Sequence, residues 1–135
     1  MKNLKYFLIL LFVCLCLTGC GNANGRITIS GNVTFDSKPL ESGSIQFFPA
    51  NDNGITAGGN IKSGKFTTFI KSGKYVVQIT ANRKTGKKIK SINEGLPDED
   101  ELEQYIPEKY NTNSTLTVEV GDQNNPFNFE LKSAE

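Results

Sequence analysis

Histidine is absent from all 135 residues of the chain, and cysteine occurs only three times. Without histidine the chain can form no Ser-His-Asp triad, no Cys-His pair and no imidazole metal site. The charges nearly cancel, with 15 basic and 14 acidic residues, whereas a domain that binds nucleic acid is usually strongly basic. The composition therefore argues against the common catalytic sets and against a nucleic-acid partner.

The first 19 residues have the order of a secretion signal. Lys2 and Lys5 precede an almost wholly apolar run at residues 6–17, and charge, apolar core and small residues follow one another as in such signals. The run is about a dozen residues long, while a bilayer core needs about 20. An uncleaved membrane anchor is the alternative, and the short run argues against it.

The signal ends in Leu17-Thr18-Gly19-Cys20, which resembles the lipobox of bacterial lipoproteins. The resemblance implies cleavage between Gly19 and Cys20, a diacylglyceryl group on the Cys20 sulfur, and a fatty acid such as palmitate on the new amine. Gly21 follows, and Asp at that position favours retention in the inner membrane of Gram-negative cells. We therefore expect a cell-envelope lipoprotein, in the outer membrane rather than the inner one.

Processing divides the chain into a signal peptide at 1–19, a lipidated Gly-rich tether at 20–25, and a domain at 26–135. Cys14 and Cys16 leave with the signal and Cys20 carries lipid, so the mature domain can form no disulfide. About 115 residues suffice for one small domain that buries about two thirds of its unfolded surface. The fold must therefore rest on its apolar core.

After the tether, apolar residues recur with a period of two, which indicates strands. We expect about seven, with a possible irregularity at Gly31 and a hairpin turn at Ser63-Gly64. No long helical pattern occurs, so the fold class is all-β, a single antiparallel β-sandwich. Five phenylalanines at alternating positions are expected to face inward: Phe35, Phe47, Phe66, Phe127 and Phe129.

Residues 82–114 interrupt this pattern. The segment opens basic and turns acidic, and its basic half could extend the preceding strand and turn back near Thr85-Gly86. Pro97 with the acids after it suits a helix start, and Leu102, Tyr105 and Ile106 share one helical face. We therefore predict a short helical turn here, packed on the sandwich by those three side chains.

Two longer stretches carry a family resemblance. Residues 31–49 read GNVTFDSKPLESGSIQFFP, and residues 106–120 read IPEKYNTNSTLTVEV. They resemble the opening G-x-V-x-F-D-G-K-P-L and closing P-x-K-Y-x-x-x-S-T-L patterns of transthyretin-like (prealbumin-like, carboxypeptidase-regulatory-like) domains in planctomycete-type lipoproteins. Ser37 departs from the family, which usually has Gly there. The resemblance implies a lipid-anchored sandwich of seven or eight strands with no established activity.

Taken together, these features predict a lipid-anchored envelope protein with a non-enzymatic β-sandwich as a binding or structural module and no cofactor. Its expected partners are the membrane, through the lipid, and an envelope protein or polysaccharide. An alternative is a ligand- or Ca²⁺-binding module that uses residues 82–113. Asp98, Asp100 and Glu101 are the candidate ligands, although they lack the spacing of a dedicated calcium loop. Tyr110 is expected to play a structural role, as the tyrosine corner does in β-sandwiches.

Overall fold

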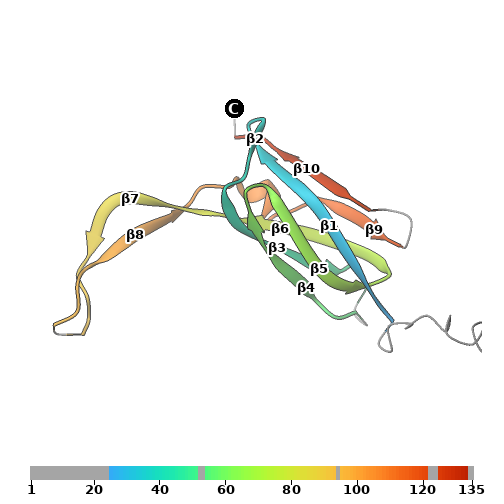
Figure 1. Ribbon diagram of the computed structural model, residues 1–135, viewed down its shortest axis with the longest axis horizontal. Coiled ribbons are helices and arrows are strands. Elements are labelled where there is room, and N and C mark those ends of the chain that lie inside the picture. Colours follow the sequence, from blue (N-terminus) through green and yellow to red (C-terminus); the bar gives the residue numbers. More distant parts are fainter. Residues whose placement is uncertain (1–24, 52–53, 94, 122–124, 134–135) are drawn as a thin grey trace, which may run out of the picture.

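A computed structural model describes residues 25–51, 54–93, 95–121 and 125–133. The predicted signal peptide at 1–19, its cleavage site at Gly19 and the lipidated Cys20 lie outside these residues. The described part is nearly all β (Figure 1). Its elements are β1 (Arg26–Phe35), β2 (Lys38–Pro39), β3 (Ser42–Pro49), β4 (Ala57–Lys62), β5 (Lys65–Lys71), β6 (Gly73–Thr80), β7 (Asn82–Ile89), β8 (Glu99–Gln104), the 3₁₀ turn η2 (Glu108–Tyr110), β9 (Thr117–Val120) and β10 (Phe127–Leu131).

One curled sheet forms the body, with the strand order β10-β1-β5-β4-β3-β6-β9 and β2 beside β1. β4 and β5 share only the register pair Lys62 and Lys65 at their hairpin. Beyond that pair, the Thr68 hydroxyl donates to the Gly58 carbonyl over 2.7 Å, in place of a regular ladder. The sheet folds over at this point, and its inner faces enclose one core. The predicted all-β, sandwich-like fold is confirmed.

The inner faces follow the period-two pattern of the sequence. β5 buries Phe66, Thr68 and Ile70, and its intervening residues are exposed. β6 likewise buries Tyr75, Val77 and Ile79, with half-buried residues between and after them. Because successive side chains of a strand point to opposite faces, this alternation alone assigns the core side of both strands.

Aromatic rings occupy the centre of the core. The Phe47 ring lies 6.0 Å from that of Phe66 and 6.4 Å from that of Tyr75, and Phe66 lies 6.0 Å from Phe129. These three phenylalanines are buried as predicted, whereas Phe35 and Phe127 are only half-buried and pack against the core from its rim. Such ring pairs add about 0.5–1.5 kcal/mol each beyond their buried area, in a domain whose described part has no disulfide.

The predicted hairpin at Ser63-Gly64 joins β4 to β5, with φ of 49° and 74°. A second two-residue turn, Asp36-Ser37, joins β1 to β2 with φ of 48° and 66°. Positive φ at both central residues defines a type I′ turn, whose twist matches that of the flanking strands. Ser37 therefore occupies a left-handed position that favours glycine.

One strand pair departs from the antiparallel prediction, because β10 runs parallel to β1. The irregularity suggested at Gly31 is absent from β1, which is continuous there. Glycine is required for a different reason: a Cβ at position 31 would lie 2.1 Å from the Phe127 carbonyl oxygen. The glycine lets β10 approach closely at the first register pair of the parallel ladder.

Candidate functional site

A two-stranded arm, residues 82–104, projects from the body (Figure 1). β7 continues the chain from β6 and pairs with β8 in a sheet of its own. All eight residues of β7 are exposed, and the core residues stop at Ala81 and resume at Ile106. The arm is therefore the one large element in the described part of the chain that gives no side chain to the core.

The helix predicted to start at Pro97 is wrong, because Glu99–Gln104 forms strand β8. The acidic residues that suit a helix start instead lie opposite the basic residues of β7, which is a long-range pairing that local pattern cannot reveal. Leu102 is 58% exposed and does not pack on the sandwich, whereas Ile106 is buried. The helical turn within the 82–114 segment is η2, which follows Pro107.

The predicted reversal at Thr85-Gly86 is also wrong, because β7 runs on to Ile89. The register shifts between Lys84 and Lys88, and Gly86 has φ of 86°. Between these two register pairs β7 advances four residues and β8 only two, so β7 carries extra residues, and with a glycine in the left-handed region they form a β-bulge. The bulge bends the arm, and such irregularities are among the devices that discourage pairing of an exposed edge strand with other chains.

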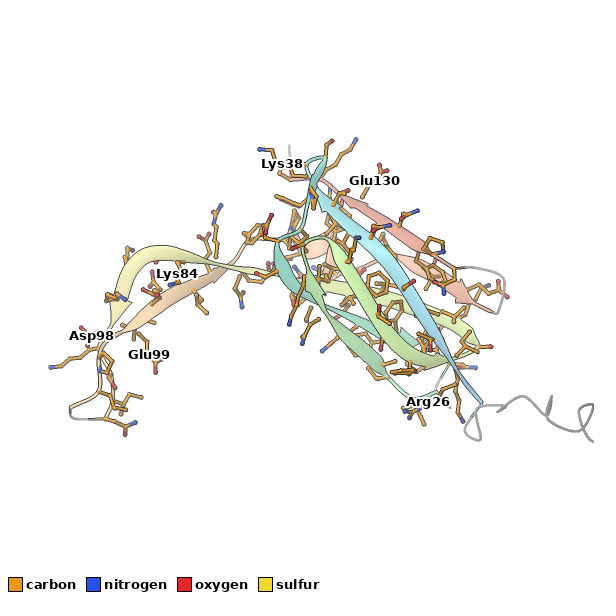
Figure 2. The ribbon with its side chains drawn as sticks, in the orientation of Figure 1. Arg26, Lys38, Lys84, Asp98, Glu99 and Glu130 are labelled. Carbon is orange, nitrogen blue, oxygen red and sulfur yellow. The ribbon has the colours of Figure 1, made fainter. Side chains whose placement is uncertain are left out.

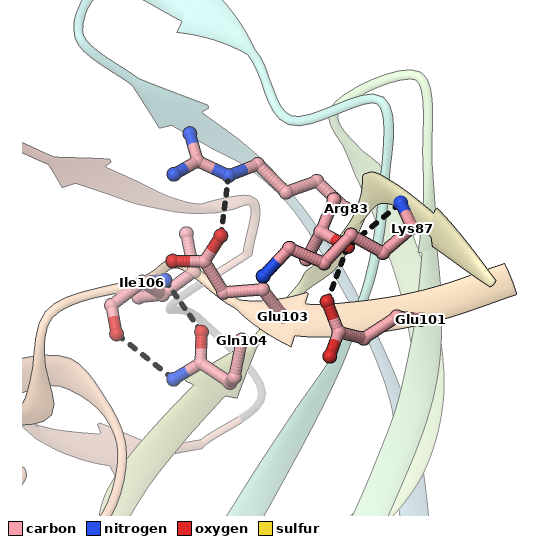
Figure 3. Close-up of polar contacts among 7 residues, drawn as sticks. Arg83, Lys87, Glu101, Glu103, Gln104 and Ile106 are labelled. Carbon is pink, nitrogen blue, oxygen red and sulfur yellow. Dashed lines mark hydrogen bonds and ion pairs between the residues drawn. The ribbon is translucent and has the colours of Figure 1, made fainter. Parts of the chain in front are cut away.

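Hydrogen bonds close the arm at its base (Figure 3). The Gln104 side chain brackets Ile106: its Oε1 accepts from the Ile106 amide at 2.5 Å and its Nε2 donates to the Ile106 carbonyl at 2.8 Å. The Tyr105 amide donates to the Ala81 carbonyl at 3.1 Å. The Arg83 guanidinium lies 5.5 Å from the Tyr105 ring centroid. These contacts hold the base of the arm against the sandwich.

Ion pairs cross the arm along its length. Asp100 accepts from Lys84 at 2.5 Å and from Lys88 at 2.6 Å, and Arg83 meets Glu103 at 3.4 Å. The hydrogen bonds from Lys84 and then Lys88 are the main reason that the pKa of Asp100 falls from 3.8 to about 2. The same contact with Asp100 raises the pKa of Lys84.

The three candidate calcium ligands do not converge. Asp98 accepts from the Ser91 amide at 3.3 Å, Asp100 is held by its two lysines, and Glu101 accepts from the Thr85 hydroxyl at 2.6 Å. Figure 2 shows Asp98 near the outer end of the arm. Within the described ranges, no group of three or more acidic, cysteine or histidine side chains could hold a metal ion. The geometry gives the calcium alternative no support.

Exposed apolar side chains mark the outer part of the arm, a feature that the sequence analysis missed. Ile92 is 99% exposed, and Ile89 and Leu96 are each more than half exposed. Leu102 is also exposed, but it lies nearer the base, across from Lys84. Ile89, Ile92 and Leu96 lie within eight residues of one another, and large exposed apolar side chains gathered in one part of a small protein usually mark an interaction site. The sequence did contain a signal: these apolar residues lie in a polar, charged segment and do not alternate as the core residues of a strand do. We call residues 89–98 the arm tip.

The P-x-K-Y block is structural. The Tyr110 ring packs against the core, and its hydroxyl accepts from the Lys132 amide at 3.2 Å, as expected for a structural tyrosine. The neighbouring Asn111 is buried, and its side chain donates to the carbonyls of Ile106 and Pro107 at 2.7 and 3.2 Å. Asn111 was not singled out from the sequence, because its role depends on a turn that only the fold defines.

Comparison with known proteins identifies no relative: no family model, no curated protein and no solved structure matches the chain. Among the described residues, none belongs to a helix of the length and apolarity needed to cross a membrane.

Proposed function

We propose that the mature chain is a lipid-anchored cell-envelope protein of the transthyretin-like type. Its sandwich is a non-enzymatic binding module, and the arm is the element that contacts the partner. The observation that carries the binding role is the arm itself. It is a long, exposed, two-stranded ribbon with an apolar tip, and it contributes nothing to the core.

The chemistry of the arm favours a partner protein. β7 supplies cations, β8 supplies carboxylates, and the tip adds isoleucine and leucine. A surface with both signs of charge around apolar side chains is typical of protein interfaces, in which an apolar centre lies within a polar rim. A nucleic acid or an acidic polymer would require a predominantly basic surface.

The lipid anchor is supported by the signal-like residues 1–19 and by the lipobox-like Leu17–Cys20. Gly21 supports delivery to the outer membrane. Mass spectrometry of the N-terminal peptide tests the anchor: the expected species begins at Cys20 and carries a diacylglyceryl group and a fatty acid. The Cys20→Ala chain should remain unprocessed. A mature chain without lipid, or one that fractionates wholly with the inner membrane, would contradict this part of the proposal.

A short-arm variant tests the binding role. Arg83 and Glu103 are register partners, so residues 84–102 can be replaced by Asn-Gly, which forms a two-residue type I′ turn. This variant retains the base contacts of Gln104, Tyr105 and Arg83. It should fold like the parent chain, because every residue of the core remains.

Parent and short-arm chains are used side by side to capture proteins from envelope extracts at several ionic strengths. We expect the parent to retain a specific partner that the short-arm chain loses. A parent chain carrying Ile92→Asp, which places a carboxylate in the apolar tip, should bind the same partner more weakly. Equal capture by parent and short-arm chains would refute the role of the arm, and no capture by either would refute the binding module.

A further inference from the structure

Two exposed apolar side chains lie outside the arm, at the end of the sandwich where β1 begins. Phe69 is 62% exposed and Ile55 is 54% exposed. Both line a groove of about 280 Å³, together with Ala57 at the start of β4 and Ile70 near the end of β5. The groove lies where β4 and β5 have diverged from their hairpin. The groove lies at the end of the sandwich that carries Arg26. Figure 2 labels Arg26 on the side away from the arm.

Cations surround these apolar side chains. Arg26 and Lys71 are cross-strand partners and both line the groove. A second groove of about 230 Å³ shares Ile55 and Lys71 with the first and adds Lys74. Among the residues that the structure describes, neither groove is lined by an acid. Glu119 on β9 lies across from Lys74 in register. The described part of this end is therefore apolar at its centre and positive around it.

The short tether limits the distance between this end of the sandwich and the lipid on Cys20. Gly25 precedes β1 directly, and six residue steps separate Cys20 from Arg26. A fully extended chain spans at most about 3.5 Å per residue, so Arg26 lies within about 21 Å of the Cys20 backbone. A lipid on Cys20 therefore keeps this end of the sandwich within about 21 Å of the bilayer surface.

We propose that this end, formed by Phe69, Ile55, Arg26, Lys71 and Lys74, docks directly on anionic phospholipid. The inference rests on the lipid anchor of the proposed function and adds a second, protein-based contact to it. Aromatic and branched side chains enter the headgroup boundary, while lysine and arginine lay their stems along it and keep their charges among the phosphates. Docking holds the sandwich in one orientation, with the arm directed away from the membrane.

The size of the electrostatic contribution is testable. Each cation near an anionic membrane surface strengthens binding about fivefold at physiological salt. At about 1 M salt the Debye length falls to about 3 Å, and most of that contribution should disappear. Anchoring by lipid alone would not depend on these cations.

The experiment uses the mature chain, residues 20–135, in which Cys20 is the only thiol. Coupling that thiol to a maleimide lipid in vesicles reproduces the anchor whether or not cells acylate it, so the docking test can fail independently of the lipoprotein assignment. The chain has no tryptophan, so Phe69→Trp creates a single fluorescent probe on an exposed side chain. Ile92→Trp places the matched probe at the arm tip.

On vesicles of phosphatidylcholine with phosphatidylglycerol, we expect the Phe69→Trp emission to shift to the blue and to be quenched by brominated lipid. The Ile92→Trp probe should show neither change. Lys71→Glu should reduce the Phe69→Trp quenching several-fold. Lys65→Glu, at the opposite end of the same strand, should leave it unchanged.

Four results would overturn the proposal. The first is an unchanged Phe69→Trp emission on anionic vesicles, and the second is quenching of the Ile92→Trp probe instead. The third is quenching of Phe69→Trp on vesicles of phosphatidylcholine alone that equals the quenching on anionic vesicles. The fourth is a blue shift that depends on protein concentration in the absence of vesicles. The last would show that a second copy of the chain covers this surface. Lipidated Cys20 in cells together with any of these results would leave the anchor intact and remove the docking surface.

Discussion

Replacing Ser37 by glycine is expected to stabilise the sandwich. Ser37 is exposed and has φ of 66° in the turn between β1 and β2. The left-handed conformation costs a non-glycine residue about 1–2 kcal/mol, and glycine avoids that cost. Glycine also loses about 0.4–1 kcal/mol more backbone entropy on folding. The difference predicts a free energy of unfolding about 0.5–1 kcal/mol higher for Ser37→Gly.

Urea denaturation of the mature chain measures this change. With a slope of about 1.5 kcal/mol/M for a domain of this size, the midpoint should rise by about 0.3–0.7 M at constant slope. Gln46→Gly, at an exposed position inside β3, is the control. It should lower the free energy of unfolding by about 0.5–1 kcal/mol, because glycine weakens a strand interior. Loss of stability in Ser37→Gly equal to that in the control would refute the strained turn.

Further predictions concern the ladder, the core and the arm. Gly31→Ala should destabilise by about 3 kcal/mol in the same assay, because its Cβ would collide with the Phe127 carbonyl; unchanged stability would exclude the close parallel pairing. Phe47→Ala should cost about 3–5 kcal/mol, since its side chain is fully buried. The lowered pKa of Asp100 means that its stabilisation of the arm is complete above pH of about 4 and is lost as the pH falls towards about 2. Carboxyl NMR titration checks this, and Lys84→Met should raise the pKa of Asp100. Arm amides should exchange with deuterium long before those of β6.

The sandwich was predictable because its strands carry the period-two pattern locally. Phe66, Thr68 and Ile70 on β5 identify their own inner face, and Ser63-Gly64 identifies the hairpin before it. The departure of Ser37 from the glycine usual at this position is visible in the sequence, although the strain of the turn follows only from the dihedral angle. These features depend on neighbours within a few residues, so a single sequence contains them.

The arm was not predictable for the opposite reason. Leu102, Tyr105 and Ile106 have helical spacing, but strand pairing of residues 99–104 with β7 overrides it. No local signal shows that Lys84 and Lys88 would meet Asp100. The parallel ladder of β1 and β10 likewise depends on where a distant segment returns. Local patterns assigned the buried faces of strands such as β5 and β6, whereas long-range pairing determined which segment projects from the body.

The course of β6 links the two proposed surfaces. β6 begins at Gly73, beside the cations of the end proposed to dock on the membrane, and β7 continues it to Ile89. The two strands together hold sixteen residues, which rise by about 3.3 Å each, so the arm tip stands at most about 53 Å from that end, and the bulge in β7 shortens this distance. β6 is paired with β3 on one side and β9 on the other, and it buries three side chains in the core. Because a two-stranded ribbon is only marginally stable alone, the arm depends for its stability on this central strand at its base.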